Sequence, residues 1–167
     1  MSETCSDTPR PPRQQAGFTL NELVIVMVIG AILAAFAIPK FDAALSLRDD
    51  AWHDSLVSAL RIAQKTAVSH RRLVCVTVAN TSVTLNVASA NPASTCDSAL
   101  MGPSGTSTFA TAANSQTTTG VSPAGVIYFQ PDGRVTSDGA GATSSSRTLS
   151  PSGVSAISVL GETGYVE

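Results

Sequence analysis

A run of apolar residues near the start of the chain constrains its fold more than any other feature. From Phe18 to Ile38 the sequence holds 21 residues with a single charged side chain, that of Glu22. As an α-helix rising about 1.5 Å per residue, this run would be roughly 30 Å long, close to the thickness of a bilayer's hydrocarbon layer. The pattern therefore predicts one membrane-spanning helix. The 167 residues of the chain leave room for one further domain.

The segment before the apolar run has a different character. Residues 1–17 are polar, include Arg10 and Arg13, and contain three prolines, so we expect no regular structure there. The positive-inside rule predicts that this segment stays cytoplasmic and that the rest of the chain is exported. A secretory signal peptide and an ordinary signal anchor are the alternatives. Neither accounts for Glu22, because a carboxylate in lipid costs about 2.5 to 3.5 kcal/mol on insertion scales.

Residues 17–23 read GFTLNEL and lead directly into the apolar run. This stretch resembles the N-terminus of type IV pilins and type II secretion pseudopilins. The resemblance implies that a prepilin peptidase cleaves between Gly17 and Phe18, removes residues 1–17 as a leader, and methylates the new amino group of Phe18. The family commonly has Glu and Pro at the positions of Glu22 and Pro39, whereas Asn21 replaces its usual apolar residue.

The same resemblance gives a hypothesis for the carboxylate of Glu22. In a helical filament the apolar helix packs against neighbouring subunits, where Glu22 can pair with the N-terminal amine of one of them. Such a buried ion pair fixes axial register more than it adds stability. The implied partners are other pilins or pseudopilins, the prepilin peptidase and the inner-membrane assembly platform. The implied location is the bacterial inner membrane, with the head in the periplasm, before assembly and a pilus or pseudopilus afterwards.

After Pro39 the apolar residues follow the spacing of an amphipathic helix, which predicts a stem continuing to about His70. Because the periodicity resumes at once, we expect Pro39 to kink the helix and not to end it. The predicted organisation is a leader at 1–17, a membrane or filament-core helix at 18–39, a stem at 40–72 and a head at 73–167. The apolar stem positions are Phe41, Leu45, Trp52, Leu56, Ala59, Leu60, Ala63 and Ala67.

The head has the patterns of short strands. Residues 72–78 and 82–87 alternate in polarity around a short polar segment, which predicts a hairpin. Residues 125–136 predict a second hairpin, whose turn contains Pro131, Asp132 and Gly133. We expect a long loop at 88–125, and closing strands at 147–150, 156–160 and 164–167. The expected fold class is α+β, with a long N-terminal helix packed on a small antiparallel sheet, as in a pilin.

Within the pilin superfamily, the head resembles the GspH/FimT group of minor pilins and pseudopilins. The similarity depends on Phe129, Gly133 and Arg134, which match the group's pattern, and on the final strand and turn. The DNA-uptake members of this group carry a Gly-Arg-x-Arg motif near the C-terminus. Here the corresponding turn, residues 161–164, reads GETG, and the earlier sequence GRVT lacks the second arginine. DNA binding is therefore the less favoured function.

Two of the three cysteines remain after the implied cleavage, because Cys5 lies in the leader. An even pair in an exported domain favours a disulfide between Cys75 and Cys96, with two free thiols as the alternative.

Charge and motifs exclude several other functions. Ten Lys and Arg against twelve Asp and Glu give little reason to expect binding driven by bulk charge. A basic cluster at the end of the stem suits a helix C-terminus, although Arg71 and Arg72, with Arg134 from the head, are the residues that could contact DNA.

The sequence has no nucleophile motif and no Gly-rich phosphate loop, so we expect no catalysis and no cofactor. No His or Cys cluster has metal-ligand spacing, and turn chemistry accounts for Asp132 and Asp138 without calcium. A structural subunit and a pilus-displayed binding module for DNA or a surface are the two competing classes. The choice between a type IV pilus and a type II secretion system stays open.

Overall fold

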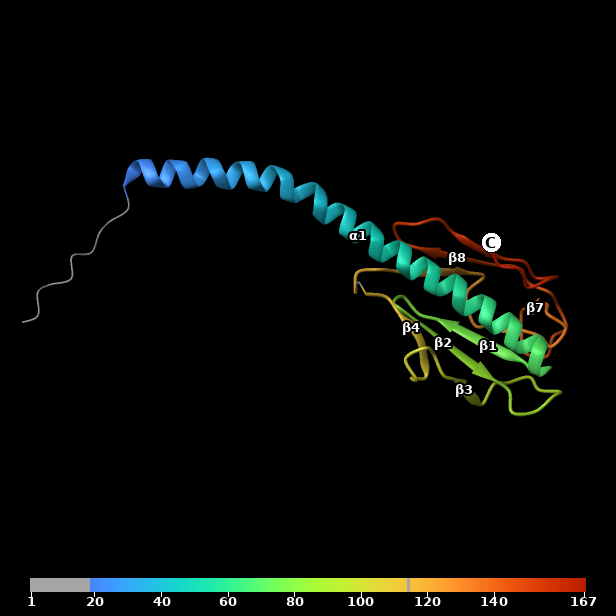
Figure 1. Ribbon diagram of the computed structural model, residues 1–167. Coiled ribbons are helices and arrows are strands. Elements are labelled where there is room, and N and C mark those ends of the chain that lie inside the picture. The colour runs from blue at the N-terminus through green and yellow to red at the C-terminus, as the bar shows by residue number, and fades with distance from the viewer. Residues whose placement is uncertain (1–18, 114) are drawn as a thin grey trace, which may run out of the picture. The chain divides into compact units, whose positions relative to one another are not determined.

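The structure is a computed structural model, in which a long helix is followed by nine short strands within the described part of the chain (Figure 1). It describes residues 19–113 and 115–167, with the side chains of 37–46 excepted. The predicted leader and Phe18 lie outside the described residues. The helix, α1, spans Leu20–His70, and therefore ends where the apolar pattern predicts. The chain divides into two compact units after Phe41, and α1 contributes residues to both.

The first unit contains the apolar part of α1. Every described side chain from Thr19 to Phe36 is exposed. The exposed fraction is about half or more even for large residues, as in Val24 at 47%, Met27 at 67% and Phe36 at 72%. A helix that is apolar on all faces has no favourable contact with water, so it needs a cover of lipid or protein. The predicted kink at Pro39, and the side chains of Phe41 and Leu45, lie outside the described side chains.

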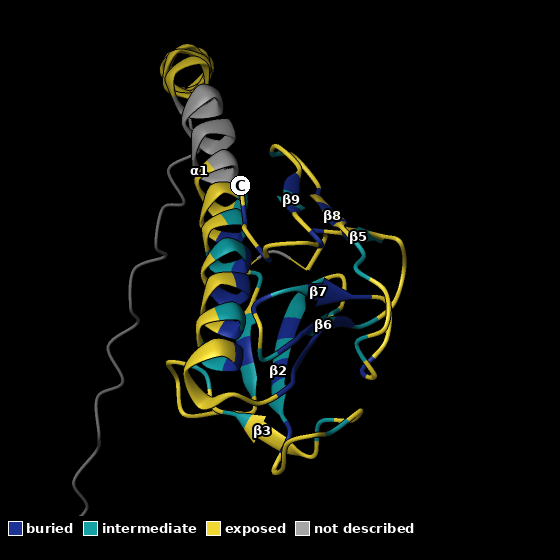
Figure 2. Cartoon of the chain, turned by 90° about the vertical axis from the view of Figure 1, so that its right-hand side faces the viewer, coloured by how far each residue is buried: buried dark blue, intermediate teal, exposed yellow. Residues whose placement is uncertain are grey.

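The second unit begins with the stem part of α1, where the apolar side chains form one buried stripe (Figure 2). Their spacing of three or four residues places them on one helix face, and the strands cover that face. Alanine at several of these positions leaves room for the helix backbone to approach the strands closely. The buried members are Trp52, Leu56, Ala59, Leu60, Ala63 and Ala67, all no more than 2% exposed.

The C-terminal end of α1 has a defined cap. The N–H of Arg72 donates to the Ala67 carbonyl at 3.1 Å, and the N–H of Arg71 donates to that of Val68 at 3.4 Å. Arg71 itself has a φ of 51°, in the left-handed region. These features form a Schellman motif, in which glycine is the usual residue at the position of Arg71. The chain turns sharply there and enters the first strand.

Six of the strands form one antiparallel sheet, in the order β3-β2-β1-β6-β7, with β4 also paired to β2. The predicted first hairpin is confirmed, because Val74 pairs with Val87 and Val78 with Val83. The second is confirmed by the pairing of Phe129 with Val135. The bounds are Val74–Val78 for β1, Ser82–Val87 for β2, Ser98–Leu100 for β3, Thr108–Thr111 for β4, Ile127–Phe129 for β6 and Val135–Thr136 for β7.

The other three strands form a separate antiparallel sheet with the order β5-β8-β9. They are β5 at Thr119–Ser122, β8 at Arg147–Pro151 and β9 at Ile157–Val159. The predicted last strand contributes a single bridge between Val166 and Val159. Inward side chains of both sheets join the helix stripe in one core, which includes Val76, Leu85, Phe129, Leu149 and Ile157. The α+β fold class, with a long N-terminal helix and antiparallel strands, is confirmed.

The expectation of one long loop at 88–125 was wrong, because β3, β4 and β5 lie within it. These strands have three or four residues each and are rich in Ser and Thr, so they carry almost no period-two signal. Their partners are distant in sequence. Thr108 pairs with Thr84, and Thr119 pairs with Pro151. The expectation of a single sheet was incomplete for the same reason.

Candidate functional site

Glu22 occupies the first turn of α1 and is exposed. Thr19 caps this helix end, since its hydroxyl accepts a hydrogen bond from the Glu22 N–H at 3.2 Å. Its carbonyl accepts one from the Leu23 N–H, also at 3.2 Å. A carboxylate in the first turn also interacts favourably with the helix dipole. The structure thus adds a local role for Glu22 that the sequence analysis missed, although a Thr followed three residues later by Glu is the signature of a capping box.

Beside the carboxylate lies an apolar strip of the same helix. Glu22, Leu23, Val26 and Met27 line a shallow surface depression of about 370 Å³. Residues separated by three or four positions share a helix face, so the carboxylate projects from an otherwise apolar surface. Any protein packed on this face must satisfy the carboxylate, because an ionised group without a partner is costly to bury.

The predicted membrane-spanning helix lies partly within the residues whose side chains are described. None of the helical segments whose side chains are described is long and apolar enough to cross a membrane. The predicted span at 18–39 extends beyond those side chains at both ends. Gly17 and Phe18, the residues of the predicted cleavage and methylation, lie outside the described residues.

Cys75 and Cys96 form the predicted disulfide, with their Cα atoms 6.1 Å apart. Cys75 lies on β1, and Cys96 lies in the segment between β2 and β3. The bridge belongs to a second, smaller apolar cluster with Leu73 and Ala88. It therefore ties an irregular segment of the head to its central sheet.

The three arginines that could contact DNA differ in whether their side chains already bind other groups of the head. Arg72 donates to the carbonyls of Ala88, at 3.3 Å, and Ser89, so it joins the helix end to the segment after β2. Arg134 donates through Nε to Asp132 at 2.8 Å, within the turn between β6 and β7. Only Arg71 makes no side-chain hydrogen bond or ion pair with the described residues. The DNA contact by these residues stays a prediction.

Two carboxylates reflect these arrangements in their pKa values. The Ser89 hydroxyl and backbone N–H donate to Asp97 and hold its pKa below the ordinary value, and the charge of Arg72 acts in the same direction. Burial acts to raise the pKa of Asp132, but the hydrogen bonds and charge of Arg134 outweigh it and the pKa is lowered. Both groups are therefore ionised partners of structural contacts.

The described residues hold no cluster of candidate metal ligands. No group of three His, Cys, Asp or Glu side chains in them could hold a metal ion. Asp138 is used locally, since its carboxylate accepts from the Gly141 N–H at 3.1 Å. On α1, Nδ1 of His53 lies 3.5 Å from Oδ1 of Asp54, whose side chain is exposed.

Residues 12–38 match the family model of the prokaryotic N-terminal methylation motif. No curated protein matches the chain. Among solved structures it is similar to the type IV minor pilin FimU of Pseudomonas aeruginosa, with a TM-score of 0.50 and 14% identity over 71% of this chain and 87% of that chain.

The chain thus combines a prokaryotic N-terminal methylation motif with a fold similar to that of a type IV minor pilin. The motif implies processing by prepilin peptidase and assembly with other pilins, and it fits a pilin that is anchored in the inner membrane or assembled into a pilus.

Proposed function

We propose that the protein is a minor pilin or pseudopilin of the GspH/FimT group, a non-catalytic subunit that enters a type IV pilus or type II secretion pseudopilus. One observation carries the proposal. A methylation motif leads into a helix whose described side chains are apolar and exposed on every face, from Leu23 to Phe36. Such a helix needs lipid before assembly and other subunits after it.

In this proposal the chain is first a single-pass protein of the inner membrane with its head in the periplasm. Prepilin peptidase then cleaves between Gly17 and Phe18, and the assembly platform moves the mature subunit into the filament. Mass spectrometry of the protein purified from membranes tests this step. We expect a mature chain that starts at Phe18 and carries one added methyl group, and an uncleaved chain in a Gly17→Val variant. A mature chain that retains residues 1–17 would contradict the processing step.

The role proposed for Glu22 is to pair with the N-terminal amine of a neighbouring subunit and set its register. Support comes from its position in the first turn, on an apolar and exposed helix face. Glu22→Gln keeps the size of the side chain and removes the charge, so we expect much less of the protein in sheared filaments at equal membrane abundance. Asn21→Leu is the matched control, because it changes the adjacent polar side chain and keeps the carboxylate. Equal incorporation of Glu22→Gln would refute the pairing.

The function itself is tested by the amount of filament sheared from a strain that lacks the protein, compared with parent and complemented strains. Loss of pili indicates a minor pilin that primes or stabilises a type IV pilus. Normal pili with impaired protein secretion indicate a pseudopilin. Normal pili and normal secretion, with no copy of the protein in either filament, would reject the proposed function.

A further inference from the structure

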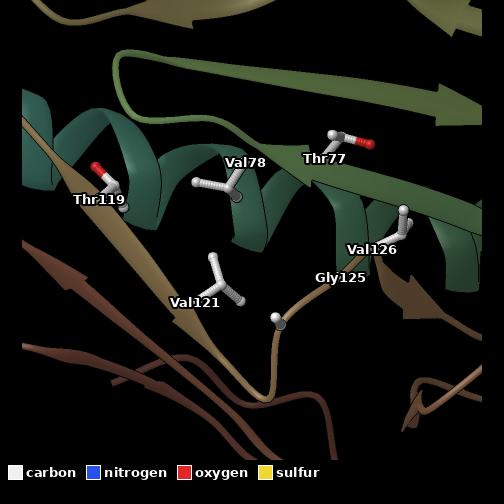
Figure 3. A pocket seen from close by; sticks show the side chains of 7 residues that line it. Thr77, Val78, Thr119, Val121, Gly125 and Val126 are labelled. Atoms are coloured by element: carbon white, nitrogen blue, oxygen red, sulfur yellow. The ribbon is translucent and has the colours of Figure 1, made fainter.

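A groove of about 290 Å³ opens between two strands that belong to different sheets of the head (Figure 3). Thr77 and Val78 of β1 line one side, and Thr119 and Val121 of β5 line the other. Residues 124–126, which lead into β6, complete the wall. In Figure 3 the side chains of Val78 and Val121 face the same space.

On the β1 side, the groove exposes backbone groups that no strand covers. The Ala79 N–H donates to the Ser82 carbonyl at 2.8 Å, so residue 79 points its backbone groups towards β2. Because these directions alternate along a strand, Val78 points its N–H and C=O the other way, towards β6. The β6 ladder, however, ends at the pair Val76 and Ile127. Among the described residues, no strand pairs with Val78 on that side.

The β5 side has the same property. β5 is an edge strand, because in the described sheet it pairs only with β8. The Ser152 N–H donates to the Thr118 carbonyl at 2.9 Å, so residue 118 points its backbone groups towards β8. By alternation, Thr119 and Val121 point their N–H and C=O groups away from β8 and towards the groove. Unpaired strand edges of this kind are templates for pairing with another chain.

Hydrogen bonds fix one end of the groove, and a glycine turn forms part of its wall. The Thr119 hydroxyl donates to the Asn80 carbonyl at 3.1 Å and accepts from Trp52 Nε1 at 3.0 Å, which fixes the start of β5 beside the β1–β2 turn. In the opposite wall, Gly125 has a φ of +117°, a conformation that other residues rarely adopt. The hydrogen bonds of Thr119 and the turn at Gly125 therefore both shape the groove.

We infer that this groove binds an extended segment of a partner polypeptide, which adds a strand between β1 and β5 and joins the two sheets. Backbone N–H and C=O groups that no described strand pairs lie on both sides, so a peptide backbone can pair with each edge in the manner of strand addition. The lining consists of Thr, Val, Ala and Gly without any charge, so the bound segment is uncharged and carries small or β-branched side chains. The inference does not depend on the proposed role in a filament.

The test uses the full chain in detergent micelles and a five-residue peptide of alternating Thr and Val, blocked at both ends. Amide NMR follows the binding, and we expect slower exchange of the N–H groups of Val78, Thr119 and Val121. A second peptide of the same sequence carries N-methyl groups on alternate backbone nitrogens. It keeps the side chains and loses the donors, so we expect binding weaker by about tenfold.

A variant of the protein tests the same hydrogen bonds by removing a backbone donor from the groove. Val121→Pro removes an N–H that points into the groove and is not used in the ladder with β8. Val121→Thr is the matched control, because it keeps both the N–H and the branched shape. We expect the proline variant to bind the peptide about tenfold more weakly and the threonine variant to bind it as the parent does. If the proline variant does not fold, the N-methylated peptide still tests the hydrogen bonds.

Three results would overturn the inference. The first is equal binding of the plain and N-methylated peptides, and the second is the absence of binding at millimolar peptide. The third is self-association of the parent chain that Val121→Pro abolishes, which would assign the groove to a second copy of the chain.

Discussion

Two parts of α1 have apolar side chains in different arrangements. From Leu23 to Phe36 they point in all directions and are exposed, whereas from Trp52 to Ala67 they form one stripe that is at most 2% exposed. The stem finds its partners within the same chain, in the strands of the head. The described side chains of the first part are exposed, and in the proposed function lipid or other subunits cover them. In the proposed function one helix serves both folding and assembly, and the distribution of its apolar residues separates the two roles.

The largest effect that tests this comparison is the loss of a buried stem side chain. Leu60 is fully buried, so Leu60→Ala should lower the free energy of unfolding by about 2 to 5 kcal/mol. Val26→Ala is the matched control, because Val26 is 63% exposed and should leave unfolding of the head unchanged. Denaturant unfolding of the detergent-solubilised chain, followed by Trp52 fluorescence, measures both. Equal losses in the two variants would show that the two parts of the helix are not distinct.

Removal of the disulfide measures how much this covalent bond stabilises the head. The bridge joins residues 21 apart in sequence. Replacing both Cys75 and Cys96 with Ala should lower the free energy of unfolding by about 3 kcal/mol, because the unfolded chain regains the freedom that the bridge removes. Thermal unfolding measures the change, with Cys5→Ala as the control for a cysteine before the predicted cleavage site. An unchanged midpoint would mean that the bridge does not constrain the head.

A smaller effect tests the backbone conformation at the end of the stem. Arg71 has a left-handed backbone, which costs a residue with a Cβ roughly 1 kcal/mol compared with glycine. Arg71→Gly should therefore raise the free energy of unfolding by about 1 kcal/mol. Arg71→Ala keeps the Cβ and removes the charge, so it separates backbone strain from electrostatics. Destabilisation by Arg71→Gly, with Arg71→Ala neutral, would show that the cap is not strained.

The smallest effect is a local dependence on pH. The pKa of Asp97 is lower in the folded protein than its ordinary value of 3.8. Its contribution to stability is therefore complete above that value and is lost as the pH falls through the lower, folded pKa. The amide hydrogen of Ser89 should exchange faster below about pH 4, relative to a reference amide that has no ionisable group beside it. Asp97→Asn should remove this acid dependence and Glu162→Gln should keep it. If Asp97→Asn kept the same pH dependence of Ser89 exchange, the Asp97 carboxylate would not be its cause.

Much of the fold could be predicted from local patterns. The stem stripe follows from residues three and four positions apart, which share a helix face wherever the strands lie. Two hairpins follow from alternation around short turns, as in the turn at Asp132 and Gly133. The resemblance at residues 17–23 gave the methylation motif that the family model matches. These features depend on residues close together in sequence, so the sequence itself determined them.

Tertiary structure decided the rest, because the relevant contacts join residues far apart in the chain. Arg72 is held by a carbonyl 17 residues away, which its charge alone does not reveal. β5 is a strand because β8 pairs with it, and its own four residues carry no such signal. The groove exists because β6 leaves β1 at Val76 while Thr119 is fixed to Asn80, 39 residues away. Local sequence determines the periodicity of an element, whereas only the packed chain determines which backbone groups remain without a partner.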